Sequence, residues 1–122
     1  MSDAGQPPRE WRFYIADMIE FAEKVLAYTK GVDQDTLVAD PLRYDAVLRN
    51  LELIGEAATH IPSHVRAAHP DVPWRAIVGL RNRLAHGYLT ISDHVVWTTI
   101  QEAVPSLVPS LRKALNAADE GA

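Results

Sequence analysis

Three residues in one short segment have the side-chain chemistry needed to cleave a phosphodiester bond. Arg81, His86 and Tyr88 follow one another within residues 80–88. An arginine can neutralise phosphate oxygens through paired hydrogen bonds, and a histidine can accept or release a proton near neutral pH, without help from a metal ion. The segment therefore predicts phosphate chemistry. The alternative is a solvated helix face whose C-terminal histidine is favoured by the helix dipole.

Helical geometry decides which of these side chains can act together. Asn82 and His86 are four residues apart and share one side of a helix. Arg81 lies about 140° from His86 around the helix axis. The two can converge only if the arginine bends round or the helix ends near His86. Gly87 predicts such an end, because glycine is favoured just past a helix. The apolar seam of this helix consists of Ile77, Leu80 and Leu84.

The composition is that of one globular domain. The chain has 122 residues, of which 48% are hydrophobic, and it has no cysteine. The lack of cysteine excludes a disulfide framework, a thiolate metal site and a cysteine nucleophile. The first nine residues lack the hydrophobic core of a signal peptide, and no apolar run approaches the length of a membrane span. We therefore expect a cytoplasmic protein with no membrane partner.

The balance of charge is acidic, with a formal net charge of −4. Such a balance argues against a protein that binds nucleic acid through a broad basic surface. It leaves room for an RNA enzyme with a local positive site. The arginines that could form such a site are Arg43, Arg49, Arg75, Arg81 and Arg83.

Apolar residues recur at three- and four-residue intervals, with no period-two pattern, so we predict an all-α fold. The expected architecture is an up-and-down bundle of four to five main helices. Residues 1–9 are expected to be a disordered N-terminus, 10–116 the helical domain and 117–122 a frayed tail. The predicted helices are 10–30, 41–60, 63–69, 74–86 and a last one that begins after residue 92.

Several residues mark where these helices begin and end. Asp40 is a good N-cap and Pro41 fits the first position of a helix, and Ser92 is a second candidate N-cap. Residues 31–40 are expected to be a polar connection. The apolar residues of helix 74–86 cover much of its circumference, which predicts a central place in the bundle. The last helix should be kinked, or should restart, at its prolines, which are Pro105 and Pro109.

The helix predicted at 41–60 contains two further residues of interest. Gly55 lies among its inward positions, which predicts close contact with another helix. Glu56 is either an exposed acid or a residue that orients a side chain of the motif. Arg49 and Glu52 have the spacing of an ordinary ion pair.

Three histidines, His60, His64 and His69, suggest a metal site at first sight. Pro62 disrupts the helical register between the first two, and no cysteine or well-spaced carboxylate completes a coordination set. We interpret them as surface histidines and predict neither a bound metal nor a cofactor.

Several landmarks in the same order make the chain resemble one known family, the HepT-like toxins of the HEPN superfamily. The resemblance extends over about residues 14–115. The segments that carry it are 28–31, 45–57, 73–82 and 86–88.

The resemblance implies a homodimeric, metal-independent ribonuclease that is the toxin of a toxin–antitoxin pair. Arg81 and His86 match the catalytic pair of the family, and Asn82 is the polar residue that follows the arginine. Tyr88 matches the tyrosine that the cognate antitoxin, a small nucleotidyltransferase-like protein, adenylylates to silence the toxin. One histidine cannot be both base and acid in a single step, so a dimer that joins two motifs would supply a second His86.

Two other functions are compatible with the same residues. One is a catalytically silent helical binding or dimerisation module that partners a nucleotidyltransferase. The other is a purely structural dimerisation domain. An intact Arg81 and His86 favour the ribonuclease, and a nuclease assay on the purified protein separates it from the silent module.

Overall fold

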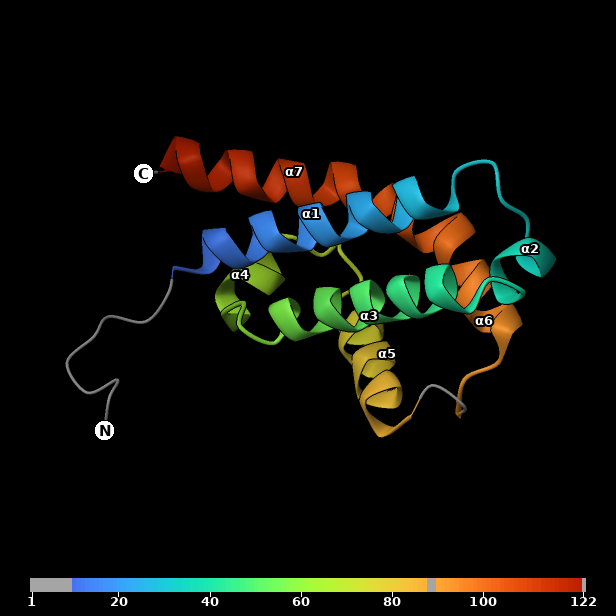
Figure 1. The fold of residues 1–122 in the computed structure, drawn as a ribbon. Coiled ribbons are helices and arrows are strands. Elements are labelled where there is room, and N and C mark those ends of the chain that lie inside the picture. The colour runs from blue at the N-terminus through green and yellow to red at the C-terminus, as the bar shows by residue number, and fades with distance from the viewer. Residues whose placement is uncertain (1–9, 88–89, 122) are drawn as a thin grey trace, which may run out of the picture.

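The computed structural model describes residues 10–87 and 90–121, and within these ranges the chain is helical and contains no strand (Figure 1). The all-α fold predicted from the sequence is confirmed. The elements in chain order are α1 (Trp11–Thr29), α2 (Gln34–Val38), α3 (Pro41–Ala58), α4 (Ser63–Ala68), α5 (Trp74–His86), α6 (Asp93–Thr98), the π-helical segment η2 (Thr99–Ala103) and α7 (Val104–Gly121).

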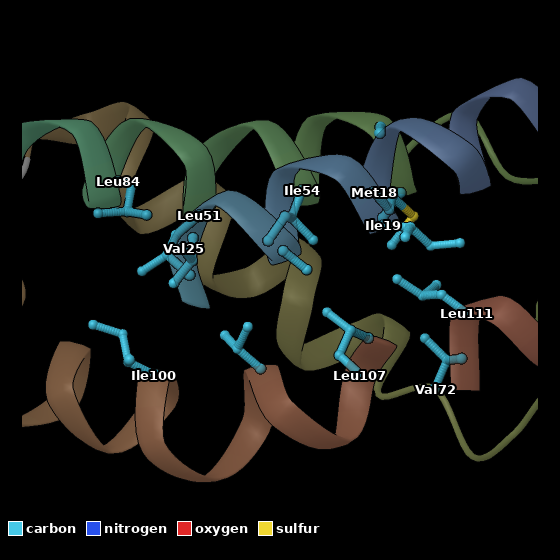
Figure 2. Close-up of a cluster of buried hydrophobic side chains, with 14 of the residues drawn as sticks. Met18, Ile19, Val25, Leu51, Ile54, Val72, Leu84, Ile100, Leu107 and Leu111 are labelled. Carbon is cyan, nitrogen blue, oxygen red and sulfur yellow. The ribbon is translucent and has the colours of Figure 1, made fainter. Parts of the chain in front are cut away.

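Helix α1 lies between α3 and α7 and runs antiparallel to both (Figure 1). Apolar residues at three- and four-residue spacing on these helices meet in one core, as predicted from the pattern. Figure 2 shows side chains from α1, α3, α5, η2 and α7 converging there. The largest side chains of the core that are almost completely buried include Ile15, Met18, Leu37, Ile61, Leu84, Ile100 and Leu111.

Helix α5 packs mainly against α3 and projects away from the layer formed by α1, α3 and α7 (Figure 1). The prediction that this helix is central was therefore wrong. Only Trp74 and Leu84 on it are buried, whereas Ile77 and Leu80 are half-buried and Ala85 is exposed. Ile77, Val78 and Leu80 still pack against the core, and the other side of the helix is exposed.

Two predicted helix starts are confirmed by their caps. The Asp40 carboxylate accepts a hydrogen bond from the backbone N–H of Arg43 at 3.2 Å, and Pro41 is the first residue of α3. The Ser92 hydroxyl accepts from the backbone N–H of Val95 at 3.2 Å, which starts α6. Each cap satisfies a backbone donor that the first turn of a helix leaves unpaired.

Residues 31–40 are not merely a polar connection, because they contain the short helix α2. The Asp33 carboxylate caps it by accepting from the backbone N–H of Thr36 at 2.8 Å. Leu37 on α2 is buried in the core. A single buried leucine and one cap therefore stabilise a turn too short to produce a periodic pattern.

The irregularity expected at the prolines lies just before them, in η2. Pro105 has no backbone N–H, so the carbonyl of Gln101 lacks its usual helical partner. The backbone here shifts to longer spacing, and the N–H of Val104 donates to the carbonyl of Thr99, five residues earlier. Pro109 lies inside α7, which continues to Gly121, beyond the boundary expected at residue 116. None of the helices in the described ranges combines the length and apolar character of a membrane span.

Candidate functional site

The helix that carries the predicted motif ends at His86, as expected. Gly87 follows with φ of 140°, a conformation that side chains other than glycine rarely adopt, and its N–H donates to the carbonyl of Leu84 at 3.1 Å. The His86 side chain is exposed at this end of α5. The imidazole is therefore accessible to a substrate.

Helices α3 and α5 come into very close contact at Gly55, which confirms the contact predicted there. A Cβ atom at this position would lie 2.2 Å from the Cβ of Arg81 and 2.9 Å from the carbonyl oxygen of Ile77. Only glycine allows this approach. The backbone of α3 thus fixes the point from which the Arg81 side chain begins.

The guanidinium of Arg81 is held between two side chains. Its Nε and Nη2 groups donate to one carboxylate oxygen of Glu56, at 2.9 and 2.5 Å. Its Nη1 group donates to the amide oxygen of Asn82 at 2.9 Å. The guanidinium is therefore held between Glu56 of α3 and the adjacent Asn82 of α5. Of the two ways in which the sequence allowed Arg81 and His86 to converge, the structure shows the second, which is the end of α5 at His86.

The structure thus brings Arg81, Asn82 and Glu56 together. Within the described ranges, no hydrogen bond or ion pair joins His86 to any of them. Tyr88 lies outside the described residues. The ordinary ion pair predicted between Arg49 and Glu52 is present, with Nη1 and Oε1 3.3 Å apart.

Sequence reasoning missed that His60 also belongs to this cluster. The His60 Nε2 atom lies 3.9 Å from the second carboxylate oxygen of Glu56. Its ring stacks on Tyr14 of α1, with ring centroids 4.4 Å apart and planes at 11°. One carboxylate thus faces Arg81 and His60 at once. The signal that could have revealed the pair is the four-residue spacing between Glu56 and His60 at the end of α3.

A largely apolar groove of about 400 Å³ lies beside the motif on α5. It is bordered on one side by α5 and on the other by α6 and η2. Its lining residues are Pro73, Ala76, Ile77, Gly79, Leu80, Arg83, Val95, Thr99 and Ala103. The lining of the groove contains no His, Asp or Glu. Among the described residues there is no group of three or more such side chains that could hold a metal ion.

This arrangement has two chemical capabilities. A guanidinium at an exposed helix edge can bind two oxygens of a phosphate through parallel N–H groups. An exposed imidazole on the same helix can transfer a proton to or from a group bound beside it. Glu56 meanwhile fixes the direction of the arginine and balances its charge while no phosphate is bound.

Comparison with known proteins assigns this sequence to a family. The family model described as "Ribonuclease HepT-like" matches residues 18–114. The Probable ribonuclease HepT of Thermococcus cleftensis is 33% identical over 105 residues, which are 86% of this chain and 96% of that protein. A protein of Methanocaldococcus jannaschii with a provisional name as an RNase is 36% identical over 99 residues, 81% of this chain and 91% of its own. No solved structure matches the chain. The matched range contains all of α3 and α5, with Glu56, Arg81 and His86. Because the family model matches most of the chain and relatives of more than 30% identity are covered almost in full, the chain belongs to the HepT-like ribonuclease family.

Proposed function

We propose that this protein is a metal-independent endoribonuclease and the toxin of a toxin–antitoxin pair. The observation that carries the proposal is the guanidinium of Arg81, which Glu56 and Asn82 hold at the exposed edge of the helix that ends at His86. The names of the relatives as ribonucleases support the same substrate class.

RNA contains its own nucleophile, the 2′-hydroxyl group. His86 takes the proton of this hydroxyl, and the 2′-oxygen attacks the neighbouring phosphorus. Arg81 stabilises the negative charge that develops on the phosphorane oxygens. The bond to the 5′-oxygen then breaks, and an acid protonates that oxygen. The products are a 2′,3′-cyclic phosphate and a 5′-hydroxyl.

The protein acts as a homodimer, because a single imidazole cannot be base and acid in one step. The groove beside α5 supports this assembly: it is apolar, open and adjacent to the motif. A second copy seated there places its own α5 against this one, so that one His86 acts as base and the other as acid. Each active site then needs residues from both copies.

The antitoxin is a nucleotidyltransferase that silences the enzyme by transferring AMP to the hydroxyl of Tyr88. Tyr88 follows His86 by two residues in the sequence. The adduct carries a negatively charged phosphodiester and a nucleoside, so it resembles a piece of the substrate. It therefore occupies the site by pairing with Arg81 as well as by its bulk.

The ribonuclease is tested with the wild type and the variants Arg81→Ala and His86→Ala on a labelled single-stranded RNA. We expect the wild type to cleave in the presence of EDTA and to leave 2′,3′-cyclic phosphate ends. Each variant should lose cleavage and keep the circular dichroism spectrum of the wild type. Arg112→Ala is the matched control, because Arg112 is a half-exposed arginine on α7 paired with Glu23.

Two outcomes contradict this proposal. Cleavage that stops on chelation and returns with Mg²⁺ would show a metal-dependent enzyme. A wild type that cleaves no RNA and does not harm cells on expression would leave the silent binding module and the structural dimerisation domain as the possible functions.

Dimerisation and silencing have separate tests. Light scattering at micromolar concentration should give the mass of a dimer, and a fully active monomer would refute the shared site. Intact mass spectrometry after co-expression with the proposed nucleotidyltransferase antitoxin should show an AMP adduct on the wild type. The Tyr88→Phe variant should lack this adduct, and the same adduct on the variant would contradict modification at Tyr88.

A further inference from the structure

Positive charge is concentrated on α5, although the chain as a whole is acidic. Three of the twelve Lys and Arg residues lie among the thirteen residues of this helix, and none of the sixteen Asp and Glu residues does. These three are Arg75, Arg81 and Arg83. Helix α5 projects from the bundle (Figure 1), and on it Arg75 and Arg83 are exposed and Arg81 is half-buried.

The five arginines that could form a positive site differ in their partners. Arg43 pairs with Asp40 at 3.5 Å, Arg49 with Glu52 at 3.3 Å, and Arg81 with Glu56. Arg75 and Arg83 are exposed, and neither forms an ion pair with any residue that the structure describes. Two arginines on the motif helix thus keep their full charge available to a ligand.

Helical geometry distinguishes between these two. Arg83 lines the apolar groove between α5 and α6. Arg75 precedes Asn82 by seven residues and His86 by eleven, so each of these two lies within about 20° of Arg75 around the axis, and they lie about 40° from each other. The outward stripe of α5 is therefore Arg75, Asn82 and His86, three exposed residues beside the guanidinium of Arg81.

Arg75 lies at the N-terminal end of α5, where a positive charge is unfavourable. It is the second residue of α5, and the positive end of a helix dipole disfavours a cation there. No acidic residue lies in this first turn to compensate. A cation at this position is disfavoured in the protein alone, and it becomes favourable when an anion binds along the stripe.

We propose that Arg75 binds a backbone phosphate of the RNA strand, several nucleotides away from the phosphate that is cleaved. Arg75 and His86 are separated by about 16 Å along the helix axis. Phosphates of a stacked strand follow one another at about 3.4 Å along its axis. A strand that contacts both residues therefore lies along α5, and the KM of the enzyme depends on the length of its substrate. This inference rests on the ribonuclease function proposed above.

The direct test is the salt dependence of RNA binding. The probe is a fluorescent 2′-O-methyl oligonucleotide of about ten nucleotides, which has no free nucleophile, and binding is measured by anisotropy. In Arg75→Gln the slope of log K against log salt should become shallower by about 0.7, because the variant neutralises one phosphate fewer. The control Arg112→Gln should keep the slope of the wild type. An unchanged slope in Arg75→Gln overturns the inference, whether or not the protein cleaves RNA.

A second test compares substrates of two lengths. A dinucleoside phosphate is too short to extend from His86 to Arg75. Arg75→Gln should therefore raise KM for a long oligoribonucleotide by about two- to fivefold more than for the dinucleotide. Equal effects on both substrates overturn the inference. So does a loss of the dimer in Arg75→Gln by light scattering, which would place Arg75 in the subunit contact.

Discussion

The close contact between α3 and α5 makes Gly55→Ala the most informative single substitution in the chain. The new Cβ would lie 2.2 Å from the Cβ of Arg81, whereas carbon atoms pack at about 3.5–4.0 Å. The second obstacle, at 2.9 Å, is the backbone carbonyl of Ile77, which no rotamer change can move. Helix α5 must therefore shift by more than about 1 Å relative to α3.

Two opposing effects set the change in stability. Overpacking of this kind costs about 1–3 kcal/mol, and alanine in place of glycine inside a helix returns about 1 kcal/mol. Because one of the contacts is with backbone, we expect the upper part of this range, a net loss of about 2 kcal/mol. For a chain of this size the loss corresponds to a fall in Tm of about 5–10 °C.

The effect on activity should exceed the effect on stability. A shift of about 1 Å in a catalytic group can lower the rate about 100-fold, and Arg81 begins at the contact that the alanine would open. The assay is cleavage of labelled RNA at 25 °C, where the variant remains folded, together with thermal unfolding. A variant with the Tm and rate of the wild type would refute the close approach. Gly79→Ala is the matched change on α5, where an added Cβ meets nothing within 4 Å, and it should not lower Tm.

Three further substitutions test how the site is supported. Glu56→Ala should lower the free energy of unfolding, measured in urea, by only about 0.5–1 kcal/mol, because the pair with Arg81 is partly exposed. RNA cleavage should fall more in this variant than in Glu56→Gln, which keeps an acceptor for the arginine. Tyr44→Phe removes a 2.7 Å hydrogen bond to Asp93 and should cost about 0.5–1 kcal/mol. Burial, and then the bond to Asp93, raise the pKa of Tyr44 above that of an unfolded tyrosine, which is about 10. The difference in unfolding free energy between the wild type and Tyr44→Phe should therefore persist below about pH 10 and shrink above it. Gly87→Ala forces alanine to a φ of 140° and should cost about 1–3 kcal/mol in thermal unfolding; an unchanged Tm would contradict the role of glycine there.

The ends of α5 were predictable because local chemistry determines them. Pro73 precedes the helix and Gly87 follows it, and the predicted and observed bounds are the same. The apolar seam on one side of the helix was equally visible in the sequence. Each of these features depends on residues within one or two turns of one another, which is the range over which a sequence pattern carries information.

The partners of the motif were not predictable in the same way. Glu56 and Arg81 are 25 residues apart, and only the packing of α5 on α3 brings them together. The place of α5 at the edge of the bundle has the same origin, because an apolar helix face does not reveal how many neighbours cover it. His60 was interpreted by itself, as a surface histidine, although its carboxylate partner lies one turn before it.

The place of α5 at the edge of the bundle is linked to the exposure of Asn82 and His86 on this helix. A helix in the centre of the bundle would bury its whole circumference, and it could not present Asn82 and His86 to a strand of RNA. An edge helix keeps these residues exposed but has fewer neighbours to fix its position. In α5 one point of attachment compensates for this, where Gly55 lets the backbones approach and Glu56 ties down Arg81. The residue at this point of attachment is thus the arginine for which we propose a role in binding phosphate.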